Sequence, residues 1–95
     1  MKAKGKPAEP AGLSAANKKL WASITSGWTL SEEGLAVLAV ALEAKQRGDE
    51  AAALLRADGL VIRTARGSVR PHPANRIRER AEAAFLQAMR QLGLE

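Results

Sequence analysis

Several residue types that build common functional sites are missing from the sequence. There is no cysteine, which excludes disulfides and thiolate-bound metals and suits a reducing compartment. The longest apolar run, residues 34–42, is far shorter than the roughly 20 residues that a membrane-spanning helix needs. No apolar segment follows the basic N-terminus, so we expect no signal peptide. The sequence therefore predicts a cytoplasmic protein that does not associate with membranes.

The residue patterns of enzymes are missing as well. The one histidine, His72, stands between two prolines without cysteine companions, which favours a turn residue over a metal ligand. Ser68 is the only serine near that histidine, no third group is placed to orient the pair, and no glycine-rich phosphate loop occurs. Glu32 and Glu33 are adjacent, so their carboxylates diverge on a helix and serve as helix-start charges. We expect no catalytic activity, no cofactor and no metal.

The chain of 95 residues fits a single small domain. A chain of this length buries only about 60–65% of its unfolded surface, so part of its stability is expected to come from partner subunits. Residues 1–12 are rich in proline, glycine and lysine, which predicts a flexible basic arm. The arm is either a solubilising tail or a phosphate-contacting segment that uses Lys2, Lys4 and Lys6. Residues 13–95 are predicted to form one helical, oligomerising domain.

The first helix is predicted to begin after Ser14, a good N-cap residue, and to end at Gly27. Trp28, just beyond it, is expected to fold over the apolar face of this helix as part of the core. Three large apolar residues share that face at helical spacing: Leu20, Trp21 and Ile24.

The second helix is predicted to begin after Ser31, to continue through Gly48, and to end at Asp58-Gly59. Its first half is apolar nearly all round, and such a helix must be covered on several sides. Because a domain this small offers little material to do so, we expect part of this helix to pack against another subunit. The predicted oligomer interface consists of Leu35, Val37, Leu38, Val40 and Leu42.

Residues 60–70 contain strand-forming residues on both sides of a turn at Ala65-Arg66-Gly67, which predicts a short β-hairpin, with an irregular loop as the alternative. Asn75 is predicted to cap a last helix that ends at Gly93. The apolar stripe of that helix consists of Ile77, Ala81, Ala84, Phe85, Ala88, Met89 and Leu92. The expected fold is mainly α: a three-helix domain with a long central helix and a short β-hairpin or loop before the last helix.

Positive charge is concentrated at two places, the basic N-terminal arm and an arginine-rich segment. Residues 60–80 contain six arginines and one acid, a net charge of +5 that equals the formal charge of the whole chain. This concentration points to a polyanion, and arginine suits bidentate phosphate contacts. The alternative is ion pairing with the acidic second helix of a neighbouring subunit. The predicted DNA-binding residues are Arg63, Arg66, Arg70, Arg76, Arg80, Lys2, Lys4 and Lys6.

Residues 27–30 join the first two helices over a length that a helix-turn-helix could use. The second helix is nevertheless far too apolar to lie in a major groove. If DNA is bound, contact with the phosphate backbone is therefore expected rather than readout of the bases.

A set of short motifs stands in a fixed order along residues 13–94. They are Leu13-Ser14 with Lys18-Lys19-Leu20-Trp21, Leu30-Ser31-Glu32-Glu33 with Leu35 and Leu38, Ala53-Leu54, Gly59-Leu60-Val61, Thr64, Gly67, Pro71, Pro73-Ala74 and Leu92-Gly93-Leu94. Because its motifs follow this order, the chain resembles the small subunit of phage terminase. The family concerned is the helical one of tailed phages, whose members are often encoded beside an HNH endonuclease.

The resemblance implies a subunit that oligomerises, typically as a ring, in the host cytoplasm. It implies binding of double-stranded phage DNA and its presentation to the large terminase subunit, which holds the ATPase and nuclease. The HNH endonuclease is a further candidate partner. Two rival functions remain open: a small DNA-binding transcriptional regulator, and a pure oligomeric assembly protein whose arginines pair with acids of its neighbours.

Overall fold

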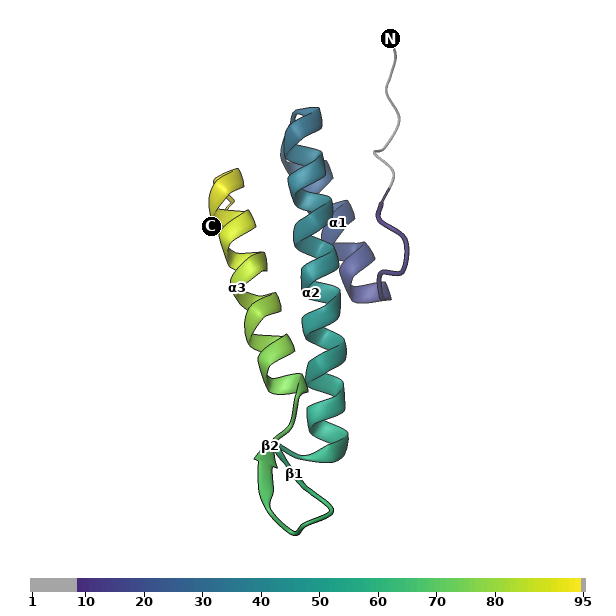
Figure 1. The fold of residues 1–95 in the computed structure, drawn as a ribbon. Helices are drawn as coiled ribbons and strands as arrows, with labels where there is room; N and C mark the ends of the chain where they lie inside the picture. Colours follow the sequence, from purple (N-terminus) through teal and green to yellow (C-terminus); the bar gives the residue numbers. More distant parts are fainter. Residues whose placement is uncertain (1–8, 95) are drawn as a thin grey trace.

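The fold is a long helical hairpin with a shorter helix against one side (Figure 1). Its elements follow the order α1 (Ala15–Gly27), α2 (Glu32–Asp58), β1 (Val61–Arg63), β2 (Val69–Pro71) and α3 (Ala74–Leu92). The computed structural model describes residues 9–94, so Lys2, Lys4 and Lys6 lie outside the described residues. The molecule is elongated, with extents of 62 × 23 × 18 Å. The expected mainly α fold with three helices and a β-hairpin is confirmed.

Both predicted ends of α1 are confirmed. Ser14 Oγ accepts a hydrogen bond from the Asn17 N–H over 3.3 Å, which satisfies one of the free amides of the first turn. At the other end, the Trp28 N–H donates to Ile24 O over 3.0 Å. Trp28 itself is 54% exposed, so the prediction that it belongs to the core is wrong. The helix stops one residue before it, and its extended backbone (φ −135°, ψ 141°) carries the ring off the apolar face.

The ends of α2 are also those predicted. Ser31 Oγ accepts a hydrogen bond from the Gly34 N–H over 3.0 Å, and two acids of the first turn lie at the positive end of the helix dipole. The helix continues through Gly48 for a total of 27 residues. It ends where Gly59 adopts φ +87°, a conformation that favours glycine. No helix within residues 9–94 is long and apolar enough to cross a bilayer.

Strands β1 and β2 form an antiparallel hairpin in which Ile62 pairs with Arg70 at the centre. The turn depends on Gly67 at φ +86°, and the Thr64 N–H donates to Ser68 O over 2.8 Å. Every strand residue is exposed, so the hairpin has no core of its own. The hairpin, and not the irregular loop, is therefore the structure of this segment.

The start of α3 differs from the prediction. Asn75 does not cap the helix, because its side-chain amide donates to Leu60 O over 3.0 Å instead. Pro73 occupies the N-cap position and makes no side-chain capping bond. The amide of Ala74 is satisfied from outside the helix, where it donates to His72 Nδ1 over 3.0 Å. A histidine in the preceding turn therefore performs the role expected of Asn75.

The end of α3 at Gly93 is confirmed. This glycine adopts φ +74°, and its N–H donates to Arg90 O over 3.0 Å. The Leu94 N–H turns back to Met89 O over 2.9 Å, which completes a Schellman motif. Leu94 and Met89 both pack against the main core, so the cap also fixes the last apolar contact of the chain.

The main core lies where all three helices meet. Its buried members are Leu13, Trp21, Ile24, Leu38 and Leu42, and it receives partly buried residues of α3 that include Phe85, Met89 and Leu92. Leu38 and Leu42 are 0% exposed, so they belong to the core of their own chain and offer no surface to another subunit. Two residues predicted on the buried stripe of α3 are exposed instead, namely Ile77 at 49% and Ala84.

Small residues line the contact between α2 and α3. The buried ones are Ala41, Ala44, Gly48 and Ala51 of α2 and Ala74, Ala81 and Ala88 of α3. A Cβ placed on Gly48 would lie only 3.1 Å from Ala81 Cβ. A glycine inside a helix costs about 1 kcal/mol relative to alanine. The close approach of α3 explains why the helix contains one at this position.

A buried polar contact fixes α1 on α2. Asn17 is 0% exposed, and its Nδ2 donates to Gln46 Oε1 over 2.8 Å and to Asp49 Oδ2 over 3.0 Å. Gln46 Oε1 also accepts the Ser14 N–H over 2.9 Å. The start of α1 is thereby tied to the middle of α2, so α1 covers only the N-terminal half of that helix.

Candidate nucleic-acid interface

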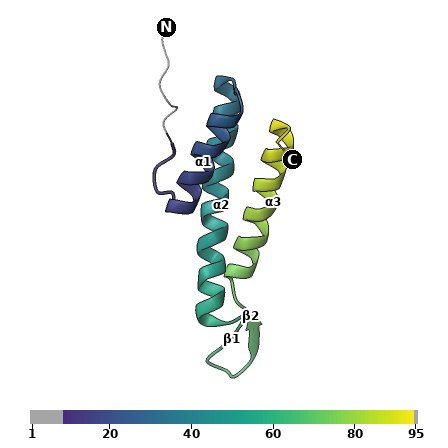
Figure 2. The same ribbon diagram turned by 180° about the vertical axis from the view of Figure 1, so that it is seen from behind.

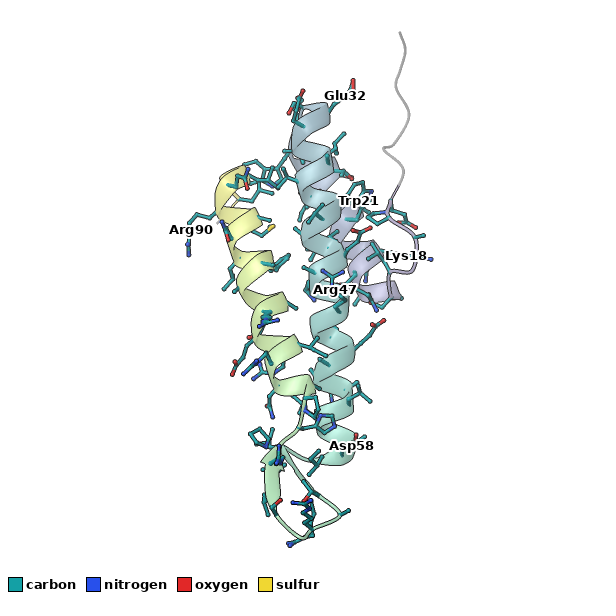
Figure 3. All side chains as sticks on the ribbon, viewed as in Figure 1. Lys18, Trp21, Glu32, Arg47, Asp58 and Arg90 are labelled. Atoms are coloured by element: carbon teal, nitrogen blue, oxygen red, sulfur yellow. The ribbon has the colours of Figure 1, made fainter. Side chains whose placement is uncertain are left out.

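The hairpin and the start of α3 lie at one end of the elongated molecule (Figure 1), and six arginines belong to the hairpin and to the first half of α3. Figure 3 shows Asp58 at this end, where α2 stops, and Arg90 near the far end of α3. The structure thus gathers all the predicted DNA-binding arginines, whereas the predicted lysines lie outside the described residues. We define the arginine cluster as Arg63, Arg66, Arg70, Arg76, Arg78 and Arg80.

The hairpin presents its arginines in different directions. Arg63 and Arg70 belong to neighbouring cross-strand pairs, so their side chains lie on opposite faces of the hairpin. Arg63 Nη1 donates to Gly67 O over 3.2 Å, which holds this side chain along the turn. Arg66 occupies the turn itself. The hairpin can therefore contact an anionic surface at its tip and on either face.

A hollow between the hairpin and α3 joins the two halves of the cluster. Its lining comes from the hairpin, the junction and the start of α3, and consists of Ile62, Arg70, Pro71, His72, Pro73, Asn75, Arg76 and Glu79. Two exposed arginines from separate elements thus border one concave surface, with a single acid beside them. Such an arrangement suits a phosphate group, because two guanidinium groups can approach it from different sides.

Most guanidinium groups of the cluster have no partner within the chain. Arg78 pairs with Glu82, with 2.8 Å between Nη1 and Oε2. Asp58, another acid at this end, is occupied by His72 over 2.9 Å. The part of the chain that the structure describes supplies no hydrogen bond or ion pair to four exposed side chains, those of Arg66, Arg70, Arg76 and Arg80.

The contacts of His72 agree with its prediction as a turn residue, and no group of three or more candidate metal ligands occurs among residues 9–94. The sequence did not predict that His72 contacts Asp58 and Asn75. Asp58 lies 14 positions before the histidine, and Asn75 contacts Leu60, 15 positions before it. No short sequence pattern predicts contacts over such separations. The paired strand formers on either side of Gly67 were the only indirect signal, since they bring these positions together.

A second surface feature lies on α2 and α3 away from α1. Helix α1 lies behind α2 in Figure 1 and in front of it in Figure 2, so no element within residues 9–94 covers the other side of the α2–α3 layer. Val40 is two positions from both Leu38 and Leu42, which places it on the opposite side of α2. The uncovered side holds an uncharged groove lined by Ala36, Val37, Val40, Ala84, Gln87, Ala88 and Gln91.

The predicted interface residues fall into two groups, those that line the groove and those that belong to the main core. Val40 is 60% exposed and Val37 is half-buried, and both line the groove. Leu35 packs against the main core together with Leu38 and Leu42. Only Val37 and Val40 therefore remain on a surface that another subunit could cover, and α3 supplies the rest of that surface, which periodicity in α2 alone could not indicate.

Comparison with known proteins places the chain in a family. Residues 15–95 match the family described as phage terminase, small subunit. The matched range covers every helix and strand described above. No curated protein and no solved structure matches the chain. The resemblance predicted from the ordered motifs is confirmed, and the chain belongs to the phage terminase small subunit family.

Proposed function

We propose that this terminase small subunit is a non-catalytic, oligomeric DNA-binding adaptor. It recognises double-stranded phage DNA and regulates the large terminase subunit during genome packaging in the host cytoplasm. The observation that carries the proposal is the arginine cluster at one end of the molecule, in which four exposed arginines have no partner within residues 9–94.

The cluster contacts phosphates rather than base edges. Its arginines project from a short hairpin and from the flank of α3, and the guanidinium fork suits phosphate oxygens. Helix α2 offers no polar face that would fill a major groove, because α1 and α3 cover it and its remaining groove is uncharged. Backbone contacts fix the position of the protein on DNA without reading its sequence.

The test is duplex binding at several salt concentrations. Wild-type protein is expected to lose affinity steeply as salt rises, because each phosphate contact releases counterions. The triple variant Arg63→Ala, Arg66→Ala and Arg70→Ala removes up to three contacts. The slope of log affinity against log salt should then flatten by roughly 0.9 for each contact, or about 2.7 in all. Fluorescence anisotropy with a labelled duplex measures both quantities.

The matched control replaces three basic residues away from the cluster, Lys18, Lys19 and Arg47, with alanine. This control lowers the net charge equally and should leave the slope nearly unchanged. Equal flattening in both variants would show that total charge governs binding. An unchanged slope in the hairpin variant would move the contacts to α3 or to the N-terminal arm. Absence of duplex binding by the wild type would refute the proposed function.

The oligomer is proposed to form through the uncharged groove on α2 and α3. The groove offers apolar surface at Val40, small residues that allow close packing, and two glutamines at its border. An uncharged exposed surface of this kind is typical of protein–protein contacts, because no charged group must lose its water. Val37 and Val40 are the α2 residues of the predicted interface that this proposal retains.

Val40→Glu is expected to dissociate the oligomer, because a carboxylate in the covered groove would be buried without a partner. Light scattering should show a mass several times lower than that of the wild type at the same micromolar concentration. Leu54→Glu is the matched control, since Leu54 is 51% exposed on the same helix but lies outside the groove. A Val40→Glu protein of wild-type mass would place the interface elsewhere.

A further inference from the structure

The base of the hairpin is held by a small network centred on His72. The imidazole Nε2 lies 2.9 Å from Asp58 Oδ2, and Nδ1 accepts the Ala74 N–H over 3.0 Å. The main chain of the same residue is also engaged: its N–H donates to Leu60 O over 2.9 Å, and its carbonyl accepts the Asn75 N–H over 3.0 Å. One residue thus contacts the end of α2, the stem of the hairpin and the start of α3.

The hydrogen bonds of the network determine which tautomer the neutral imidazole adopts. Because Nδ1 accepts a hydrogen bond from a backbone amide, the neutral ring carries its proton on Nε2. Nε2–H then donates to the carboxylate of Asp58. The His72 side chain is 12% exposed, and both of its ring nitrogens have hydrogen-bond partners within the protein.

The position of Asp58 supports a role beyond its own helix. It is the last residue of α2, where the negative end of the helix dipole disfavours an acid. Its carboxylate therefore destabilises the end of α2, and the hydrogen bond to His72 compensates for this cost. The observation indicates that Asp58 serves the junction between α2 and the hairpin rather than the stability of α2.

The hairpin needs such an attachment. Its strands have three residues each and bury no side chain, and an isolated two-stranded hairpin of this size is marginal in water. Asn75 adds a second tie, since its Nδ2 donates both to Leu60 O over 3.0 Å and to His72 O over 3.2 Å. Without these bonds the hairpin would be joined to the helices by flexible backbone only.

We propose that His72 is a positioning residue which, through Asp58 and Ala74, fixes the arginine hairpin against the end of the helical hairpin. It thereby sets Arg70 and Arg76 on the two sides of their common hollow before any ligand arrives. Preorganisation of this kind raises affinity because less freedom is lost on binding. The effect on DNA affinity rests on the proposed function, whereas the ordering of the hairpin does not.

The ordering is tested without DNA, by amide hydrogen exchange in the full chain. The probes are the Thr64 N–H inside the hairpin and the His72 N–H at its stem. His72→Ala and Asp58→Ala should each reduce protection at both amides at least tenfold, while amides in the middle of α2 keep wild-type protection. Asp58→Asn is the matched control, because it removes the same charge but keeps an oxygen that accepts from Nε2.

DNA affinity provides the second readout. His72→Ala should bind duplex about tenfold more weakly at every salt concentration, with an unchanged salt slope, because all arginines remain. Asp58→Asn should bind at least as tightly as the wild type. A lower slope in His72→Ala would mean that phosphate contacts were lost, which contradicts a purely positioning role.

The two proposals fail in different ways. If wild-type protein does not bind DNA, the proposed function is refuted and the exchange data still decide the role of His72. If His72→Ala unfolds, Asp58→Ala carries the test, since it leaves the Ala74 bond in place. Wild-type protection of the hairpin amides in both variants, or an equal loss in Asp58→Asn, would overturn the positioning role.

Discussion

Gly48→Leu is expected to destabilise the protein by about 3 kcal/mol, more than any other single substitution considered for this fold. A Cβ at Gly48 already comes within 3.1 Å of Ala81 Cβ, and leucine adds three further carbons beyond it. The two helices cannot move apart at this point without opening their contact at the neighbouring alanines. Leucine gains under 1 kcal/mol of helix propensity over glycine, which does not compensate.

The measurement is thermal unfolding followed by circular dichroism at one fixed protein concentration, because an oligomer melts in a concentration-dependent way. For a domain of this size, a loss of about 3 kcal/mol lowers the melting temperature by roughly 12–24 °C. A Gly48→Leu protein that melts within a few degrees of the wild type would contradict the close approach of α2 and α3.

An exchange of the two residues provides the matched control. Gly48→Ala combined with Ala81→Gly moves one methyl group from α3 to α2 and keeps the volume at the contact. The helix propensities of the two changes cancel, so stability should return to within about 0.5 kcal/mol of the wild type. Gly48→Ala alone gains propensity but crowds Ala81. The double-mutant cycle therefore measures how strongly the two positions are coupled.

The ends of the helices could be predicted because their chemistry is local. Ser14 and Ser31 accept amides three residues ahead, and Gly59 and Gly93 adopt backbone conformations that favour glycine. Such signals depend on a few neighbouring residues and survive in any tertiary context. The start of α3 could not be predicted in the same way, because the partner of Asn75 lies at Leu60 and is brought close only by the hairpin.

The faces of α2 illustrate a second limit. Its sequence is apolar on several sides, and periodicity alone does not tell which side is covered by the same chain and which by a neighbour. Leu38 and Leu42 face α1 because Asn17 anchors that helix to Gln46 and Asp49, a contact between positions about 30 residues apart. That anchor determines which apolar residues, such as Val40, are left on the surface.

Charge reversal in α3 is expected to have the largest effect on DNA binding. The double variant Arg76→Glu and Arg80→Glu should lower duplex affinity on the order of 100-fold, since it removes two charge-assisted contacts and adds repulsion worth about 3 kcal/mol together. The helix itself should persist. One like-charge pair replaces another at the same spacing, and acids near the N-terminus of α3 favour the helix dipole.

The control and a second measurement distinguish the rival functions. Lys18→Glu with Lys19→Glu changes the net charge equally on exposed residues of α1, and should weaken binding less than about fivefold if the arginine cluster is the site. Equal losses in both variants would mean that overall charge governs binding. Light scattering on the same samples decides the remaining alternative. If the arginines serve only to pair with acids of neighbouring subunits, the α3 variant loses its oligomeric mass. If they serve DNA, the mass stays that of the wild type while the affinity falls.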